Sequence, residues 1–204
     1  MPDSFVHLHV HSEYSTLDST VRTKALVARA AELGMPAVAI TDHGNLYAAV
    51  EFYQNAHSAG IKPILGCEIY LAPASLHDKK DVPGRKNSSH LTLLAKNKTG
   101  WGNLVKLVSV GHLDGDYLGE PRIDREQLAK FSEGLICLSG CINGAVNEWI
   151  QANDIEGARQ EIISLRDIFG AEDFYLELND QRLEQQQVAN AQLKVFADEL
   201  AIKL

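Results

Sequence analysis

Three histidines alternate along the first apolar run of the sequence, which reads FVHLHVHS. If this run is an extended strand, its side chains point alternately to opposite faces, so His7, His9 and His11 share one face. Buried imidazoles without a partner are costly, whereas zinc and similar divalent ions bind neutral imidazole well. The pattern therefore predicts a metal site. The alternative is one structural histidine with two solvent-exposed neighbours, which would be the better interpretation of a lone histidine.

Further ligand-type side chains stand at or beside the ends of other apolar runs. In parallel α/β folds the carboxyl ends of the strands meet at one edge and form the site. His90 differs from the others, because it begins its run instead of ending it. Each residue alone is weak evidence, since a Thr-Asp-His triplet is also typical of a turn and a free cysteine often acts as a small hydrophobe. Together they predict a multinuclear metal centre. The candidates are Asp18, His43, Glu68, His90 and Cys141.

The remaining cysteines and histidines are expected outside this centre. Cys67 is the immediate neighbour of Glu68 and should point to the opposite face, into the core. Cys137 lies deeper on the strand that leads to Cys141 and is also expected in the core. The other histidines are expected at the surface; they are His57, His77 and His112.

The elements that must position these residues alternate along the chain. Short apolar, β-rich runs predict buried strands at 5–10, 37–41, 63–71, 90–95, 135–139 and 174–178. Between them, apolar residues at helical spacing, mostly followed by glycine, predict helices at 22–33, 46–58, 101–110, 155–169 and 183–200. Strands that alternate with helices indicate an α/β fold with a parallel sheet, either open or forming part of a barrel. Segments 73–89 and 111–121 are expected to be surface loops.

Length and composition are those of one globular domain. The chain has 204 residues, of which 45% are hydrophobic and 23% charged, and its formal net charge is −8. This balance disfavours disorder and a general coat for nucleic acid. We find no apolar run long enough for a membrane span and no secretory signal at the start, which favours a cytoplasmic protein with no membrane partner. Three cysteines in that compartment make a disulfide framework improbable.

Six segments in the same order resemble the polymerase and histidinol phosphatase (PHP) domain, and within it the branch found at the amino terminus of bacterial replicative DNA polymerase III alpha subunits. The segments are HLHVHSEYSTLDS, AITDHGNLYAAVEFY, KPILGCEIYLA, HLTLLAKNKTGWGNLVKL, GLICLSGCINGAV and FYLELND. The resemblance covers nearly the whole chain. It implies a distorted (βα)7 barrel of the TIM-like kind, with up to three divalent metal ions.

The resemblance also implies a role for each candidate ligand. His9, His11 and Glu68 match ligands of the first metal, with Glu68 bridging to the second. His90 and Cys141 match the other ligands of the second metal, and Asp18 and His43 match ligands of the third. His7 falls where many relatives have aspartate and is expected to lie behind the ligands. Zinc is the expected ion, with manganese or magnesium as alternatives.

The family's last motif, an Asp-x-His on a seventh strand, is not present before the sequence ends at Leu204. We therefore expect residues 1–204 to be a PHP domain from a much longer polymerase subunit, with its barrel incomplete after the sixth strand. The ligand set of the second metal should then be whole, and those of the first and third incomplete.

The resemblance implies a metal-dependent phosphoesterase within a DNA-directed DNA polymerase, with 3′–5′ exonuclease or proofreading activity. Its implied partners are primer-template DNA, a separate proofreading exonuclease subunit and other replicase subunits. One alternative is a non-catalytic platform that stabilises the polymerase and docks the exonuclease subunit. Another is a free-standing phosphatase of the histidinol-phosphate type.

Overall fold

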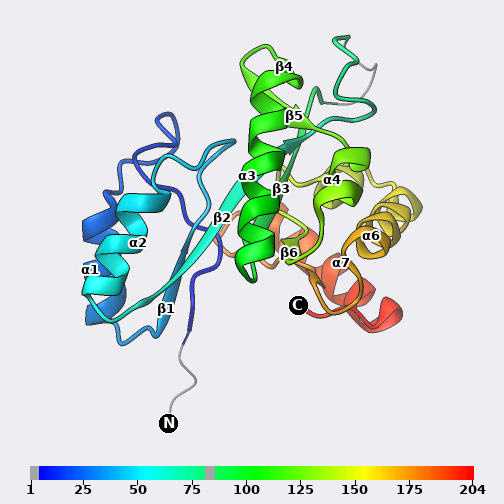
Figure 1. Cartoon of the computed structure of the whole chain (residues 1–204). Helices are drawn as coiled ribbons and strands as arrows, with labels where there is room; N and C mark the ends of the chain where they lie inside the picture. Colours follow the sequence, from blue (N-terminus) through cyan, green and yellow to red (C-terminus); the bar gives the residue numbers. More distant parts are fainter. Residues whose placement is uncertain (1–4, 81–85) are drawn as a thin grey trace.

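The structure is a computed structural model that describes residues 5–80 and 86–204. Within these residues the chain forms a mixed α/β fold in which strands and helices alternate (Figure 1). In chain order the elements are α1 Thr23–Glu32, β1 Ala37–Ile40, α2 Ala49–Ser58, β2 Lys62–Leu71, β3 Ser89–Ala95, α3 Lys98–Leu113, β4 Asp116–Tyr117, β5 Glu120–Ile123, α4 Arg125–Phe131, β6 Leu135–Leu138, α5 Ala145–Gln151, α6 Ile155–Phe169, β7 Phe174–Tyr175 and α7 Glu184–Leu200.

One sheet joins the described strands, and β2 is its longest member. The strands follow the order β4-β5-β2-β3-β6-β7, and β1 pairs with the first half of β2. Residues of neighbouring strands that stand opposite one another share a face. Glu68 of β2 faces Thr92 of β3, and Thr92 faces Leu138 of β6. A row of side chains across the sheet is therefore aligned with Glu68.

Strand β3 runs opposite to both of its neighbours, so the expectation of a fully parallel sheet is wrong at this strand. A parallel connection needs a crossover, which is usually a helix. The described part of the segment between Leu71 and Ser89 contains no helix. The chain therefore turns back at the edge where β2 ends, and β3 starts at that same edge. This reversal brings His90, at the start of β3, to the same edge as the carboxyl ends of β1, β2 and β6.

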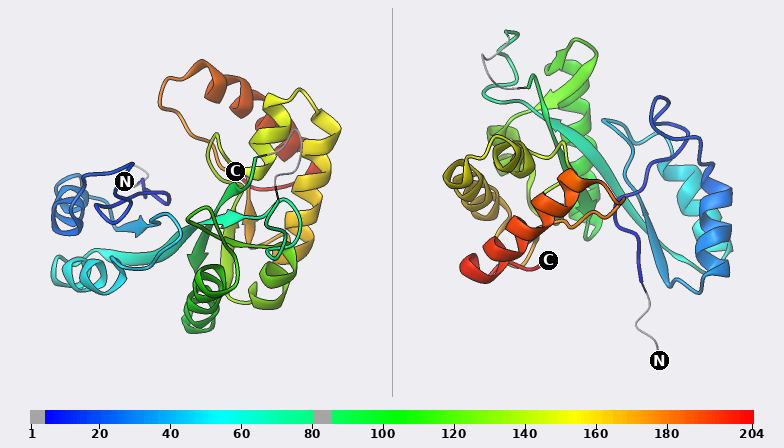
Figure 2. Two further views of the ribbon diagram at one scale, coloured as in Figure 1. Left: turned by 90° about the horizontal axis from the view of Figure 1, so that it is seen from above. Right: turned by 180° about the vertical axis from the view of Figure 1, so that it is seen from behind.

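Helices cover the outer face of the sheet, as Figures 1 and 2 show from three directions. Helices α1 and α2 pack over β1 in a core cluster that includes Val38 and Phe52. The larger core lies under α3 to α7 and contains both Cys67 and Cys137, which are buried free thiols as predicted. A small apolar cluster lies on the inner face of the sheet, the face that Glu68 shares; its buried members are Ala39, Leu94 and Leu138.

Residues 5–11 pair with β1 but do not form the regular strand that was predicted. The carbonyls of His7 and Val10 accept hydrogen bonds from the amides of Ala39 and Thr41. The two accepting residues are three positions apart in the sequence, whereas the two donating residues are only two positions apart. Segment 5–11 therefore carries one more residue than β1 over the same stretch, as a β-bulge does. The bulge breaks the alternation of faces, and Leu8 is exposed instead of packing under the helices.

Several further elements differ from the expectations. Segment 111–121 is not one loop, because it contains the end of α3, the strand β4 and the start of β5. The short helices α4 and α5 were not predicted. Of the expected loop 73–89, residues 81–85 lie outside the described residues. In the described parts of the chain, no helix combines the length and the apolarity that crossing a bilayer would require.

Candidate metal centre

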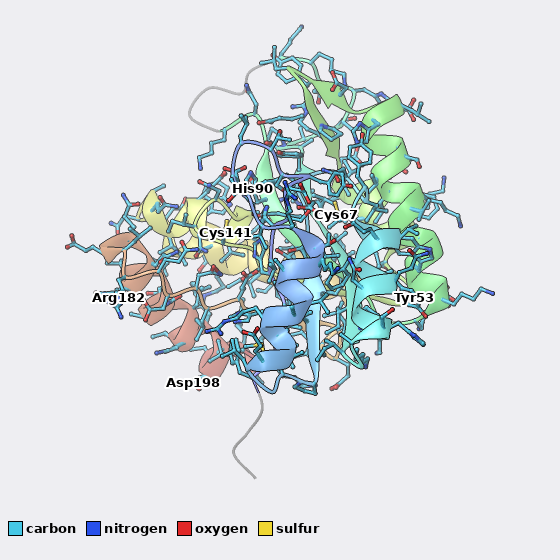
Figure 3. All side chains as sticks on the ribbon, turned by 90° about the vertical axis from the view of Figure 1, so that its left-hand side faces the viewer. Tyr53, Cys67, His90, Cys141, Arg182 and Asp198 are labelled. Atoms are coloured by element: carbon cyan, nitrogen blue, oxygen red, sulfur yellow. The ribbon has the colours of Figure 1, made fainter. Side chains whose placement is uncertain are left out.

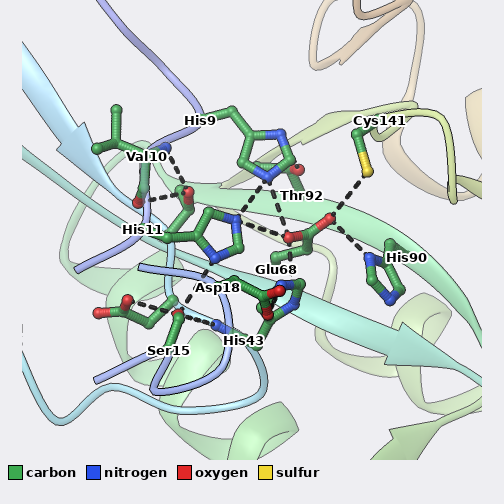
Figure 4. Close-up of polar contacts among 12 residues, drawn as sticks. His9, Val10, His11, Ser15, Asp18, His43, Glu68, His90, Thr92 and Cys141 are labelled. Carbon is green, nitrogen blue, oxygen red and sulfur yellow. Dashed lines mark hydrogen bonds and ion pairs between the residues drawn. The ribbon is translucent and has the colours of Figure 1, made fainter. Parts of the chain in front are cut away.

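Glu68 is the centre of a cluster of ligand-type side chains on the inner face of the sheet (Figure 4). Its side chain is 1% exposed. The backbone pairing of β1 and β2 continues past β1, because the amide of Glu68 bonds the carbonyl of Asp42 and the amide of Gly44 bonds the carbonyl of Glu68. This extension carries His43 alongside Glu68 in a parallel bridge.

His9 and His11 approach one oxygen of Glu68. Their Nε2 atoms lie 3.1 Å and 2.8 Å from Oε2 of Glu68, and they lie 3.1 Å from each other. All three atoms are acceptors when the rings are neutral with their protons on Nδ1. Three acceptors this close need a cation among them, which is either a proton or a metal ion.

His43 joins the same oxygen from another direction. Its Nδ1 lies 3.2 Å from Oε2 of Glu68, and its Nε2 lies 3.2 Å from Oδ2 of Asp18. The direction of this Nδ1 does not suit a hydrogen bond, so the buried atom has no hydrogen-bond partner among the described residues. The ring also packs 4.2 Å from the ring of His11.

His90 and Cys141 approach the second oxygen of Glu68. Nδ1 of His90 lies 3.0 Å and Sγ of Cys141 3.5 Å from Oε1. Backbone contacts hold both residues, since the amide of His90 bonds the carbonyl of Asn143 and Asn147 donates to the carbonyl of Cys141. Figure 3 places His90 and Cys141 close together near the middle of the molecule.

The structure thus brings all seven predicted residues into one cluster. Five of them contact the carboxylate of Glu68 directly, and Asp18 contacts His43. The seven are His9, His11, Asp18, His43, Glu68, His90 and Cys141. His7 is exposed and packs against Phe5, so it does not lie behind the ligands as expected. The surface interpretation of His57, His77 and His112 is correct. The exposed His112 also places its Nε2 against the carbonyl of Gly44.

Two carboxylates beside the cluster were missed, the partly buried Glu177 and the buried Asp42. Oε1 of Glu177 lies 2.6 Å from Nδ1 of His9, and Asp42 accepts hydrogen bonds from Ser12 and Ser15. Both had a signal in the sequence. Glu177 lies within the apolar run 174–178, and Asp42 directly precedes His43 at the end of another run.

Burial and close contacts shift the pKa values of the cluster. Burial lowers the pKa of His9, but the hydrogen bonds and charges of Glu177 and Glu68 outweigh it and raise the value to about 10. Burial alone would raise the pKa of Glu68, but hydrogen bonds from His11, His9 and His90 bring it well below its usual range. Burial, followed by the charge of Glu68, raises the pKa of Cys141 to about 12.

These observations fit a divalent metal centre. Two sets of donor atoms are close enough to hold an ion; one is His9, His11 and Glu68, and the other is His43, Glu68 and His90. Imidazole, thiolate and carboxylate are ligands that zinc accepts, and a mixed set with few oxygens is less suited to magnesium. The unpaired Nδ1 of His43 and the converging acceptors around Oε2 are what an ion would satisfy.

Comparison with known proteins finds relatives along nearly the whole chain. The family model of the PHP domain matches residues 7–181. DNA polymerase III subunit alpha of Borreliella burgdorferi is 46% identical over 200 residues, which cover 98% of this chain and 17% of that protein. The corresponding subunits of Saccharopolyspora erythraea and Aquifex aeolicus are 43% and 39% identical, and the matches cover 98% and 100% of this chain and 18% of each relative.

The chain therefore spans less than a fifth of the length of these curated relatives. Among solved structures, a protein from Bifidobacterium adolescentis assigned as a metal-dependent phosphoesterase superposes with a TM-score of 0.54. That match covers 98% of this chain and 85% of the other at 16% sequence identity. At this identity the likeness concerns the fold, which is consistent with the (βα) barrel implied by the sequence.

Proposed function

The chain belongs to the PHP domain family, and from that membership we propose that the cluster around Glu68 is the metal centre of a phosphoesterase. One observation carries the proposal. Five donor side chains from four separate segments approach a single buried carboxylate, each to within 3.5 Å. Such an array is costly to bury unless cations bind it.

We assign the ligands by their position around the two oxygens of Glu68. His9 and His11 with Oε2 take the first ion, and His90 and Cys141 with Oε1 take the second. Asp18 and His43 take a third, although His43 is also close enough to share the ion held by His90. Zinc is the ion we expect, because the set includes a thiol and several imidazoles, with manganese and magnesium as alternatives.

Divalent ions in these positions would lower the pKa of a coordinated water and offset the charge that develops on a phosphodiester. The chain's own residues prepare the site for this role. Glu68 supplies a negative charge to both donor sets, and the apolar side chains of Ala39, Leu94 and Leu138 are buried on the same face of the sheet. Each histidine must present a ring nitrogen that carries no proton in order to coordinate an ion.

We further propose that this domain is part of a DNA polymerase III alpha subunit that works in the cytoplasm on primer-template DNA. The identities of 39–46% to such subunits, and the small share of their length that the chain spans, support this proposal. Nucleotide addition would then belong to the remainder of the subunit, and 3′–5′ exonuclease activity to this domain. Lys203 pairs in parallel with Tyr175 of β7, which is where a further strand with an Asp-x-His motif would begin.

The test uses a chain extended past Leu204 to include that motif. Metal analysis after dialysis against trace zinc should show at least two ions per chain, and a 3′-labelled primer should be hydrolysed. The variant Cys141→Ala should lose an ion and the activity, whereas His57→Ala, a change on the exposed face of α2, should lose neither. A chain that binds no metal, or one whose activity survives Cys141→Ala, would contradict the proposal.

A platform role is the second candidate, and one surface favours it. A groove of about 410 Å³ between the loop after His43 and α3 is lined by Leu46, Tyr47, Val105 and Val108, among others. Tyr47 is 69% and the neighbouring Leu113 83% exposed. Apolar groups gathered in this way are typical of a protein-docking surface. The resemblance names the proofreading exonuclease subunit as its partner.

The two roles can be separated by paired variants in the extended chain. Tyr47→Asp with Leu113→Asp should weaken binding of the exonuclease subunit and leave the metal content unchanged, whereas Cys141→Ala should do the reverse. If the first variant binds the subunit normally, the groove is not its docking surface. The polymerase relatives also favour this branch over a free-standing phosphatase, because they are several times longer than this chain.

A further inference from the structure

Two carboxylates, the partly buried Glu177 and the buried Asp42, stand behind the alternating histidines, on the side away from Glu68. Glu177 approaches His9 directly, and Asp42 approaches His11 through the hydroxyl of Ser15. Neither carboxylate belongs to the donor sets that could hold an ion within the described residues. Their role is therefore not explained by direct coordination.

On the His9 side, the direction of the hydrogen bond is determined by the partner. The Nδ1 atom of His9 lies 2.6 Å from Oε1 of Glu177, and an ionised carboxylate only accepts, so Nδ1 must carry the proton. Glu177 is itself held in place by two hydrogen bonds. Its backbone amide donates to the hydroxyl of Ser139, and the side-chain amide of Asn179 donates to its Oε1. The ring is thereby oriented with Nε2 toward Glu68.

On the His11 side, the single hydroxyl proton of Ser15 determines the direction of the hydrogen bond between Ser15 and His11. Its hydroxyl donates to Oδ1 of Asp42 at 2.7 Å, so toward Nδ1 of His11, at 3.2 Å, the oxygen of Ser15 can only accept. Nδ1 of His11 is thus also protonated. Asp42 is 2% exposed and accepts two more hydrogen bonds from Ser12, which fixes the carboxylate behind Ser15.

We infer that Glu177 and the Ser15–Asp42 pair are positioning residues that hold His9 and His11 in the Nδ1-protonated tautomer, with both Nε2 lone pairs turned toward the metal. The inference rests on the proposed function, in which these histidines are ligands. It adds that the rings are oriented before the ion arrives. An outer hydrogen bond of this kind fixes the orientation of a ligand ring and makes its free nitrogen a better donor.

Two variants test the two sides separately in a chain extended past Leu204, in which we expect the ion of His9 and His11 to have its full ligand set. Glu177→Gln keeps the shape of the side chain but removes its charge, and Ser15→Ala removes the acceptor behind His11. Each should weaken zinc binding roughly 10-fold, measured by competition with a chelator. The matched controls are Glu184→Gln and Ser58→Ala, which make the same changes at exposed positions of α7 and α2. Both controls should bind zinc as the unaltered chain does.

The signature that separates positioning from a general structural effect is the tautomer of each ring. Long-range ¹H–¹⁵N spectra of the zinc-loaded chain should show Nδ1 protonated in both His9 and His11. Glu177→Gln should disturb the signals of His9 and leave those of His11 unchanged, and Ser15→Ala should do the opposite. Equal zinc affinity in variants and controls would overturn the inference. A zinc-loaded unaltered chain with Nε2 protonated in His9 would also overturn it, and this second measurement does not depend on whether a variant folds.

The same spectra distinguish this inference from the proposed function. In the metal-free chain the Nδ1 proton of His9 should appear far downfield because it bonds Glu177, and Glu177→Gln should move it. If the chain binds no zinc but this effect is present, the metal proposal fails and the hydrogen bond is confirmed. If zinc binds and the effect is absent, the positioning role is wrong and the metal centre stands.

Discussion

Glu68 governs the charge of the cluster because both of its oxygens are used. Oε2 faces His9, His11 and His43, and Oε1 faces His90 and Cys141. A buried carboxylate among imidazoles keeps its charge in the absence of metal, since the hydrogen bonds that the rings donate outweigh the cost of burial. The same charge is what draws a divalent ion.

Replacing Glu68 with Gln should therefore act on binding and on stability. Gln has the same size but no charge, and it would present an amide donor where acceptors are required. We expect zinc affinity to fall by more than about 100-fold, beyond the loss typical of an outer hydrogen bond. The metal-free chain should lose roughly 3 kcal/mol of unfolding free energy, because buried charged hydrogen bonds are broken. Denaturant titration and chelator competition measure the two effects, and the exposed Glu133→Gln is the control.

Metal binding should release protons at neutral pH. The pKa of His9 is raised to about 10 and that of Cys141 to about 12, so both groups are protonated in the metal-free chain and must lose a proton to coordinate. An ion bound by His9 and His11 displaces a proton from His9, and an ion bound by His90 and Cys141 displaces one from Cys141, so the logarithm of the zinc affinity should rise by about one per pH unit. Calorimetry at pH 7.5 in buffers of different ionisation enthalpy counts the protons. An affinity independent of pH between 6 and 8 would contradict this prediction.

The raised pKa of His9 also makes a prediction for the metal-free chain. Its stabilising contribution is complete below the ordinary histidine pKa of 6.5 and is lost as the pH rises through about 10. The melting temperature measured with a chelator present should therefore decrease from pH 7 to pH 10. In Glu177→Gln this slope should be smaller, because the carboxylate that contributes most to the raised pKa has been neutralised. A melting temperature that rises over this range would show that His9 is not held protonated.

At the scale of elements, the carboxyl edge of the sheet was predictable and the direction of one strand was not. Strand ends place His43, Glu68 and Cys141 at one edge, as the sequence indicated. His90 reaches that edge only because β3 is antiparallel, and periodicity does not report strand direction. The polar loop without a helical pattern before His90 was the available signal, because a parallel connection would need a crossover.

The bulge near the start of the chain was not predictable from alternation either. His7, His9 and His11 have the spacing of one strand face, yet the extra residue between His7 and Val10 separates His7 from the other two. A bulge depends on how the segment pairs with its neighbour β1, and that pairing is not written in the segment itself. For the same reason Glu177 was missed, because only the fold shows that it stands behind His9.

The turn after β6 offers a test at this scale. Gly140 has φ of +85°, and a Cβ there would lie 2.7 Å from the carbonyl oxygen of His90. Gly140→Ala should cost about 1–3 kcal/mol of unfolding free energy and displace His90, so zinc affinity should fall as well. Gly34→Ala is the matched control, since φ is +69° there but no atom lies within 4 Å of the added Cβ. The control should lose about 1 kcal/mol and no zinc affinity.

At the scale of the whole molecule, the two donor sets compete for a limited amount of negative charge. One zinc ion carries two positive charges, which Glu68 and the thiolate of Cys141 together balance. A second ion would have to share Glu68 and rely on Asp18, whose side chain is 60% exposed. Two dications close together repel strongly in a buried site unless more carboxylates separate them.

We therefore expect the chain of 204 residues to bind at most about one zinc ion tightly, through Glu68, His90 and Cys141, and to show little or no exonuclease activity. The further ligands would come from the Asp-x-His motif that we propose beyond Leu204. Metal analysis after dialysis counts the ions, and Cys141→Ala should remove the tight one while His57→Ala keeps it. Tight binding of three ions by this chain, or vigorous hydrolysis of a 3′-labelled primer, would show that the described residues already hold a complete centre. The ligand assignment around the two oxygens of Glu68 would then be wrong.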